Sequence, residues 1–452
     1  MRASFHLEHA LLPSGFARDV AVAVVDGVVA SVGPAPAGGA QRLPGIAVPG
    51  LPNLHCHAFQ RGMAGLAERR GPAEDTFWTW RDVMYRFLRR LSPDDVEAIA
   101  AYAYVEMLER GFTTVGEFHY LHHAPDGRPY DDPGELAGRI VAAAATAGIG
   151  LALLPCYYAQ GGFGGAPPVE GQRRFVTSLD GFARLHGRVR DHARAWPGTT
   201  VGVAPHSLRA VTPGDLARLL EASPDGPVHI HAAEQVGEVE DCLAWSGRRP
   251  VEWLLDEADP GRRWCLIHAT HMTPAETARL AATGAVAGLC PLTEGSLGDG
   301  IFDGVRFLGA GGRFGVGTDS NIEIDAAGEL RQLEYSQRLA GRGRNMLTTT
   351  EGESTGARLV GEALRGGAQA LDQPIGAIAP GLRADIVVLD TEHPAFAGCG
   401  PETWLDAWVF CGGRDLVRTV LRAGEVVVAD GRHRSRDAVA ARYRAALSRV
   451  LA

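Results

Sequence analysis

The sequence contains no lysine, and all 44 of its basic residues are arginine. This absence excludes a Schiff-base lysine, the lysine of a phosphate-binding loop and a carbamylated lysine that bridges two metal ions. Any metal site in this chain is therefore expected to hold a single ion rather than a bridged pair.

Cysteine is also scarce. The seven cysteines are scattered and form no C-x-x-C pair, which predicts reduced, mostly buried thiols in a cytoplasmic protein. Residues 1–6 lack the basic and then apolar pattern of a secretion signal. The uncharged stretch 140–159 has the length of a membrane span, but glycine and proline interrupt it, so a helix end followed by a buried strand is predicted.

The charge of the chain disfavours nucleic acid and anionic membranes as partners, because the formal net charge is −9. The length of 452 residues allows one large domain and a smaller one. A small-molecule substrate is the partner that these properties favour.

Two histidines separated by one residue close a short apolar run, Pro49-Gly50-Leu51-Pro52-Asn53-Leu54-His55-Cys56-His57. Because side chains alternate along a strand, His55 and His57 project from the same face. An isolated pair of this kind is more often packed than metal-binding. Three later β-rich runs, however, end at His231, His268 and Asp319. Two histidines, a third histidine and an aspartate are a sufficient ligand set for a catalytic zinc ion.

The middle of the chain alternates strands with helices, a pattern typical of a parallel sheet with helical crossovers. Eight successive strands favour a closed (β/α)₈ barrel at 49–370, in which catalytic residues lie at the carboxyl ends of the strands. The strands are predicted near 48–55, 113–118, 150–155, 200–204, 228–232, 264–268, 285–289 and 314–318.

The two ends of the chain have a different character. β-type runs with turns at 1–48 and again at 371–430, including 375–378, 384–390 and 419–428, predict a small second domain built from both termini. Residues 435–452 form a predicted helix with Val439, Tyr443, Leu447 and Leu451 on one stripe, packing either on its own subunit or on another.

Two further segments carry local signals. Ser92, Pro93 and the acidic residues after them predict the start of a helix that ends before Gly111. The aromatic segment 77–87, in a connection too long for an ordinary loop, either covers the barrel mouth or packs on the barrel as an amphipathic helix. These two interpretations are compatible.

The order of these ligands, the H-A-A-E segment at 231–234, and Gly-Leu-Arg-Ala-Asp-Ile-Val-Val-Leu-Asp at 381–390 together resemble the amidohydrolase superfamily. The missing lysine in strand four is similar to its mononuclear deaminase branch. The resemblance covers nearly the whole chain and implies a barrel flanked by a β-sandwich, one zinc ion per subunit and a homodimer. Segments 54–62, 77–81, 116–122, 204–209 and 290–300 are similar to the deiminases of N-formimino-L-glutamate in histidine degradation.

This resemblance implies a role for each candidate residue. His55, His57, His231 and Asp319 would hold zinc, which brings the pKa of water down to about 7. Glu234 would carry a proton to the departing nitrogen, as a non-ligand glutamate does in other zinc deaminases. His268 would act as the base, with the division of proton transfer between His268 and Asp319 left open. A helix-capping role for Glu234 and a buried structural role for His268 are the plainer alternatives.

A substrate with two carboxylates needs cationic partners, and the fork of arginine matches a carboxylate. Arg81 and Arg209 are the predicted anchors, with Gln60, Tyr120 and His206 completing the hydrogen bonds. Arg81 stacked on its tryptophan neighbours and Arg209 as a surface charge are the alternatives. His119, His122, His123 and His271 also lie near strand ends but fit no ligand position, and they are interpreted as structural or as supports of the residues that hold the metal.

Three functions remain open from the sequence. The first is zinc-dependent deimination of N-formimino-L-glutamate to N-formyl-L-glutamate and ammonia. The second is a deaminase or hydrolase of a heterocycle of the guanine, cytosine, S-adenosylhomocysteine or triazine type. The third is an inactive barrel that serves as a binding or scaffold protein, which the joint presence of ligands, proton carrier and anchors disfavours.

Overall fold

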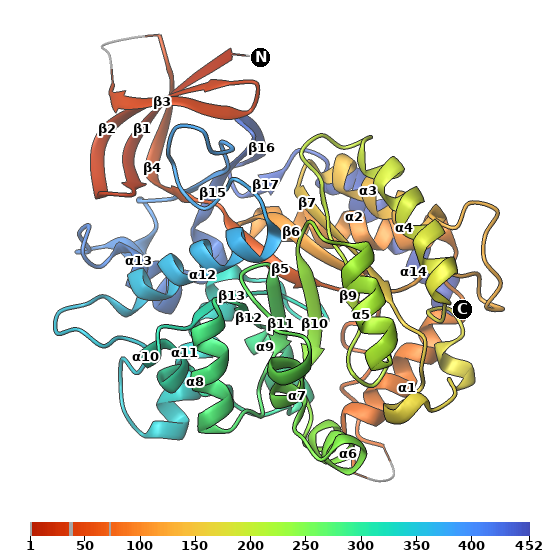
Figure 1. The fold of residues 1–452 in the computed structure, drawn as a ribbon. Coiled ribbons are helices and arrows are strands. Elements are labelled where there is room, and N and C mark those ends of the chain that lie inside the picture. Colours follow the sequence, from red (N-terminus) through yellow and green to blue (C-terminus); the bar gives the residue numbers. More distant parts are fainter. Residues whose placement is uncertain (1, 36–38, 72–73) are drawn as a thin grey trace.

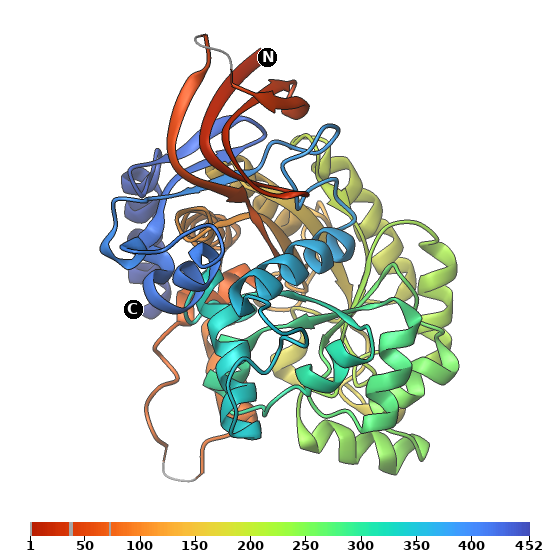
Figure 2. The same ribbon diagram turned by 90° about the vertical axis from the view of Figure 1, so that its left-hand side faces the viewer.

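The structure is a computed structural model of the chain and describes residues 2–35, 39–71 and 74–452. Figures 1 and 2 show a sheet at one end of the molecule and, below it, a body in which helices surround parallel strands. The predicted terminal segment 1–48 and the long connection that carries the aromatic segment each include residues outside the described ranges, namely 1, 36–38 and 72–73.

Both ends of the chain contribute to one eight-stranded sheet, in the order β17-β16-β15-β14-β4-β1-β2-β3. Strand β4 pairs in parallel with β1 and antiparallel with β14, so it joins the N-terminal strands to the C-terminal ones. The strands are β1 (Arg2–Leu12), β2 (Gly15–Val25), β3 (Val28–Pro34), β4 (Gln41–Pro49), β14 (Ile386–Leu389), β15 (Val417–Arg422), β16 (Glu425–Ala429) and β17 (Arg432–His433).

Turn chemistry explains the hairpin between β2 and β3, which the sequence predicts. Asp26 and Gly27 both have positive φ, 50° and 83°, as the tight turn that matches strand twist requires. A second hairpin divides the predicted run 419–428 at Ala423 and Gly424, whose φ values are also positive. The predicted strand 375–378 is wrong: Gly376 has φ +92° and lies against the Leu364 carbonyl, so the backbone turns there.

Eight parallel strand positions follow one another in the middle of the chain, close to the predicted ranges. They form two sheets, β5-β6-β7-β8 with β9 beside β7, and β10-β11-β12-β13. The strands are β5 (Leu51–Cys56), β6 (Phe112–His119), β7 (Gly150–Tyr157), β8 (Thr200–Val201), β9 (Ala204–Pro205), β10 (Val228–Ala232), β11 (Trp264–His268), β12 (Val286–Leu289) and β13 (Arg313–Val316).

Strand four differs from its prediction, because 200–204 is not one strand but the two short pieces β8 and β9. Gly202 lies between them, and a Cβ at this position would overlap the Pro227 carbonyl oxygen, far inside contact distance. The close approach of the backbone at Pro227 thus interrupts regular pairing and leaves room only for glycine.

Isolated parallel bridges connect the two sheets at both of their edges. Cys56 bridges to Asp319 on one side, while Val203 bridges to Val228 and Ser207 to His231 on the other. Backbone hydrogen bonds from His57 N to Asp319 O (2.9 Å) and from Asp319 N to His55 O (3.0 Å) reinforce the first seam. The ends of β5, β10 and the segment after β13 therefore meet.

Helices follow most of these strands and cover them (Figure 2). The α-helices are α1 (Phe77–Leu88), α2 (Pro93–Glu109), α3 (Glu135–Ala147), α4 (Leu179–Ala193), α5 (Pro213–Ala222), α6 (Val236–Ser246), α7 (Pro250–Glu257), α8 (Pro274–Thr283), α9 (Pro291–Leu297), α10 (Gly304–Gly309), α11 (Ala326–Gly341), α12 (Thr355–Leu371), α13 (Trp404–Ala407) and α14 (Arg436–Leu451). Among the described residues no helix has both the length and the apolar character that a membrane span needs.

The N-terminus of α2 forms as the sequence predicts. Ser92 accepts a hydrogen bond from the backbone of Asp95, and the Asp95 carboxylate accepts one from the backbone of Ser92. This reciprocal cap satisfies two amides that the helix leaves without partners. The aromatic segment likewise forms helix α1, capped by Thr76.

The C-terminal helix α14 packs on its own chain, against α2. Val439 is buried and Tyr443 stacks on Tyr102 of α2, with ring centroids 4.1 Å apart. A stacked aromatic pair contributes roughly 0.5–1.5 kcal/mol beyond its buried area. Leu451, the last residue of the predicted stripe, is exposed instead.

Candidate active site

The candidate ligands converge at the carboxyl ends of the parallel strands. His55 lies in β5 and His57 directly follows it, His231 lies in β10, and Asp319 follows β13. His55 Nε2 is 3.2 Å from His231 Nε2 and 3.3 Å from Asp319 Oδ1, while His57 Nε2 is 3.2 Å from the same carboxylate oxygen. All four donor atoms lie within 4.8 Å of one another.

The second nitrogen of two of these rings fixes which atom faces the centre. His57 Nδ1 donates to the Phe118 carbonyl and His231 Nδ1 to the His206 carbonyl, both at 2.9 Å. Each Nε2 therefore carries a lone pair, and these lone pairs are directed toward the same small volume between the rings. Acceptor atoms that lie this close together are stabilised by a shared cation. Backbone carbonyls are a usual partner for the outer nitrogen of a metal-binding histidine.

The charge states of the four residues suit metal binding as well. Burial lowers the pKa of His55 to about 3, and burial also lowers the pKa values of His57 and His231. Although burial opposes it, contact with His55 and His57 holds the pKa of Asp319 below its usual value. Neutral imidazoles and an ionised carboxylate are the forms that bind a divalent metal. The residues present therefore fit a single metal ion.

His268 and Glu234 flank this cluster. His268 Nδ1 donates to the Glu294 carboxylate at 3.2 Å, and its Nε2 lies 3.6 Å from Glu234 Oε1 and 3.9 Å from Asp319 Oδ2. Burial raises the pKa of Glu234 to about 7. Although burial lowers it, the carboxylates of Glu234, Asp319 and Glu294 raise the pKa of His268 to about 10. A proton held between these groups has more than one acceptor within reach.

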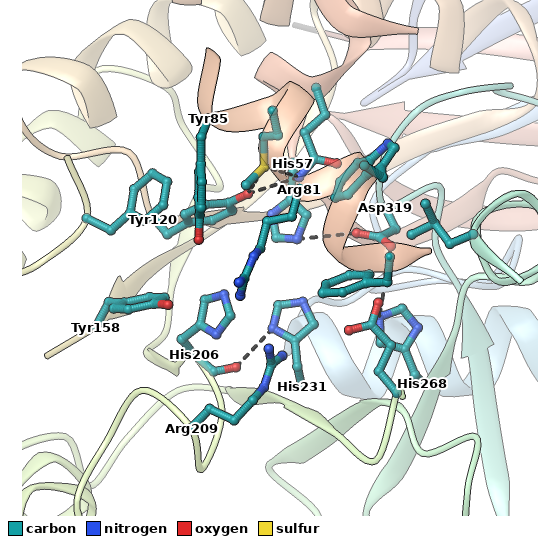
Figure 3. A pocket seen from close by; sticks show the side chains of 17 residues that line it. His57, Arg81, Tyr85, Tyr120, Tyr158, His206, Arg209, His231, His268 and Asp319 are labelled. Atoms are coloured by element: carbon teal, nitrogen blue, oxygen red, sulfur yellow. Dashed lines mark hydrogen bonds and ion pairs between the residues drawn. The ribbon is translucent and has the colours of Figure 1, made fainter. Parts of the chain in front are cut away.

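A pocket lies over the cluster, and the opposite wall comes from α1 and the strand-end loops (Figure 3). Arg81 and Arg209 enter it from opposite sides (Figure 3). Gln60 Nε2 donates to the Tyr120 hydroxyl at 2.9 Å. All five residues predicted to contact substrate line this pocket, namely Gln60, Arg81, Tyr120, His206 and Arg209, as do the catalytic candidates Glu234, His268 and Asp319.

Three polar atoms of residues that line the pocket have no hydrogen-bond partner among the described residues. They are Gln60 Oε1, Arg81 Nε and Arg209 Nε. Arg81 also stacks on Trp78, with its guanidinium carbon 4.4 Å from the ring centroid, so the stacking alternative and the pocket position hold together. Arg209 is not a surface charge, since its side chain is only 14% exposed.

The four histidines interpreted from the sequence as structural do not line the pocket. His122, His123 and His271 each bond through Nε2 to a backbone carbonyl, of Cys156, Val176 and Asp299 respectively. His119 is buried beside His122. Their structural interpretation is consistent with these contacts.

Several residues around the pocket were not expected from the sequence. Tyr85 lies one helical turn after Arg81, so the i and i+4 spacing placed it on the same face of α1. Tyr158 follows β7, where strand ends contribute to the site. Glu294 and Glu238 contact the site residues from the first turns of α9 and α6. No spacing rule connects these two glutamates to their partners.

A sequence model of the amidohydrolase family matches residues 46–427. A formimidoylglutamate deiminase from Pseudomonas aeruginosa is 52% identical over 98% of each chain. An 8-oxoguanine deaminase from the same organism is 30% identical over 90% of this chain and 88% of its own. The crystal structure of an amidohydrolase from Brucella melitensis superposes with a TM-score of 0.95, at 51% identity and full coverage of both chains.

Proposed function

Since this chain belongs to the amidohydrolase family, we propose that it hydrolyses N-formimino-L-glutamate to N-formyl-L-glutamate and ammonia. The similarity to a formimidoylglutamate deiminase over 98% of both chains supports this reaction. The single observation that carries the substrate is the placement of Arg81 and Arg209 in the same pocket as the four clustered ligands. An amidine with two carboxylates uses all of these groups.

The proposed cofactor is one zinc ion, held by His55, His57, His231 and Asp319. Three imidazole nitrogens and a carboxylate oxygen are a donor set that zinc accepts. A bound divalent metal supplies Lewis acidity, which makes water a nucleophile near neutral pH.

Proton transfer falls to Glu234 and His268. The water oxygen bonds to the formimino carbon, the carbon–nitrogen bond to the terminal nitrogen breaks, and both water protons end on that nitrogen as ammonia leaves. His268 faces Asp319 and Glu234, so it orients the attacking water, or accepts the first proton after passing its own to Glu234, because its raised pKa leaves it protonated near neutral pH. Glu234 delivers a proton to the departing nitrogen, which is the role of a positioned general acid.

Arg81 and Arg209 are the proposed anchors of the two carboxylates. Arg81 Nε has no hydrogen-bond partner among the described residues, and a buried donor left unpaired is costly. Arg209 Nε faces the Glu238 carboxylate at 3.9 Å, so this argument applies to Arg81. A substrate carboxylate removes that cost. Gln60, Tyr120 and His206 border the same space and complete the hydrogen bonds.

A heterocycle deaminase is the second candidate, because an 8-oxoguanine deaminase is 30% identical to this chain. It shares the metal ligands and differs in the pocket. A neutral ring leaves two arginines without an anionic partner, which favours the dicarboxylate. The scaffold alternative is disfavoured because ligands, proton carriers and anchors lie together.

We propose further that the two parallel sheets form one closed (β/α)₈ barrel at 49–370. The bridges at both edges of the sheets support closure. The sheet from 1–48 and 371–430 encloses its own apolar cluster, including Phe5, Val22 and Ile386, which supports a sandwich-like second domain. A C-terminal helix at 435–452 completes these boundaries. The cytoplasmic location and the homodimer remain predictions.

The test is ammonia release by the zinc-loaded protein with N-formimino-L-glutamate, beside guanine, cytosine and formiminoglycine amide. Rapid release from the dicarboxylate alone, lost in Asp319→Asn, is the expected result. Turnover of a heterocycle without release from N-formimino-L-glutamate would overturn the substrate and keep the metal site.

A further inference from the structure

A buried glutamate outside the pocket contacts two of its functional groups at once. Glu238 is 1% exposed and is the third residue of helix α6. Its Oε1 accepts the backbone N–H of Ala233 at 3.1 Å, and its Oε2 accepts that of Glu234 at 3.3 Å. The same Oε2 lies 3.9 Å from Arg209 Nε.

The backbone that Glu238 holds is a strained one. Ala233 has a φ of +52°, a left-handed conformation that costs a non-glycine residue free energy and persists only where its surroundings enforce it. This residue directly precedes Glu234. The hydrogen bonds to Glu238 therefore fix the point from which the Glu234 side chain enters the pocket.

The Arg209 guanidinium is oriented by the same carboxylate. Glu238 is the ion-pair partner of Arg209 among the described residues, and Arg209 Nε makes no hydrogen bond there. Because Arg209 is only 14% exposed, water screens this pair weakly. One side chain thus sets the position of both the predicted carboxylate anchor and the predicted proton carrier.

We propose that Glu238 is a positioning residue that couples Arg209 to Glu234, so that the binding of a substrate carboxylate and the delivery of the proton share one support. The inference rests on the proposed function, since it assigns the substrate of Arg209. In this proposal Glu238 acts through Arg209 and Glu234 and does not touch the substrate.

The chain contains a matched control one strand further along. Glu276 is the third residue of helix α8 and is 3% exposed. It accepts the backbone N–H groups of Thr273 (2.7 Å) and Glu252 (3.1 Å) and pairs with Arg249 Nε at 2.8 Å. None of these partners lines the pocket. The two glutamates therefore make the same kinds of contact and differ in what their partners do.

The experiment compares Glu238→Gln with Glu276→Gln in the zinc-loaded protein. With N-formimino-L-glutamate, Glu238→Gln should raise KM and lower kcat, each roughly tenfold, as expected when a charged partner of a buried group is lost. Glu276→Gln should leave both within about twofold, even where its thermal stability falls equally. Equal kinetic effects of the two variants would overturn the inference.

A double-variant cycle separates positioning from a general structural effect. In an Arg209→Met background, Glu238→Gln should raise KM no further, because the first substitution has already removed the contact between Arg209 and Glu238. It should still lower kcat, because the contact between Glu238 and the Glu234 backbone is intact in that background. Additive KM effects would overturn the coupling. If Glu238→Gln does not fold, Glu238→Asp takes its place, since it keeps the charge but withdraws the carboxylate by one methylene.

Calorimetric binding of N-formyl-L-glutamate gives a readout without turnover. Its affinity should weaken about tenfold in Glu238→Gln and remain unchanged in Glu276→Gln. Failure of wild-type turnover would reject the proposed reaction, while this titration would still test the Arg209 link. Absence of binding to the wild type would reject both.

Discussion

The two walls of the pocket differ in how completely their polar atoms are hydrogen-bonded. The strand-end wall consists of the metal-ligand candidates with Glu234 and His268, and the facing wall consists of α1 and the 3₁₀ helix that carries Gln60. On the strand-end wall, His57, His231 and His268 each have a second ring nitrogen bonded to a carbonyl or carboxylate. His55 is the exception among these four histidines, because its Nδ1 has no partner among the described residues. On the facing wall, Arg81 and Gln60 keep polar atoms without a partner among the described residues. The first wall is preorganised for chemistry, and the second is incomplete until a ligand binds.

Removal of a metal ligand from the strand-end wall should have the largest effect on catalysis. His231→Asn leaves three donors, and we expect kcat/KM to fall by at least about 10³-fold because a bound metal supplies several kcal/mol of transition-state stabilisation. Elemental analysis should show zinc lost in parallel. His123→Asn, which changes a histidine that bonds to a carbonyl outside the pocket, is the control. Full zinc content with full activity in His231→Asn would contradict the assignment.

Glu234→Gln tests whether the strand-end wall moves protons. We expect kcat to fall about 10²–10⁴-fold, the usual contribution of a general acid or base. KM and zinc content should hardly change, since Glu234 lies outside the four-residue cluster. Steady-state kinetics check this. An increase in KM with kcat unchanged would instead assign Glu234 to substrate binding.

Arg81→Met removes one anchor from the facing wall. The KM for N-formimino-L-glutamate should rise about 10- to 100-fold, because a hydrogen bond to a charged group is worth about 1.5–3 kcal/mol. Turnover of formiminoglycine amide, which has no carboxylate, should be unaffected. Arg86→Met is the matched control, an exposed arginine of the same helix that is not part of the pocket. Similar effects on both substrates would show a role in the helix instead.

The smallest predicted effect is on the free energy of unfolding and concerns His122, a buried residue outside the pocket. His122 lies two residues after Tyr120, and burial lowers its pKa to about 3. The folded state thus binds fewer protons than the unfolded state, whose histidine has a pKa near 6.5, so this contribution to stability is present above pH 6.5 and is lost as the pH falls towards 3. At pH 5.5 the loss is about 1 kcal/mol.

Urea unfolding at pH 7.5 and 5.5 checks this prediction. The fall in unfolding free energy should be about 1 kcal/mol smaller in His122→Gln than in the wild type, because glutamine can still donate to the Cys156 carbonyl but does not titrate. An equal fall in both proteins would exclude His122 as a source of the acid sensitivity.

The strands and their end residues could be predicted because apolar runs are local, and parallel strands bring their carboxyl ends to one edge. His55, His57, His231 and Asp319 meet for that reason. The helical form of 77–87 and the cap at Ser92 likewise depend on nearby residues.

What the sequence does not contain is the approach of distant segments. The break in strand four arises where Pro227 crowds Gly202, and the turn at 375–378 arises where Gly376 meets Leu364. The burial of Arg209 and its pairing with Glu238 depend on how α6 packs behind the pocket. Such contacts join residues without a fixed spacing, so no periodicity signals them.

The pairing of β4 with β14 has a consequence for synthesis of the chain. Val48 lies opposite Val387, so this sheet cannot close until more than three quarters of the protein has left the ribosome. Contacts between such distant residues form slowly, and an unpaired strand edge invites association with other chains. We therefore expect a nascent chain stopped before residue 386 to hold β1 to β4 with the β14 side of β4 open, and to need a chaperone until β14 emerges.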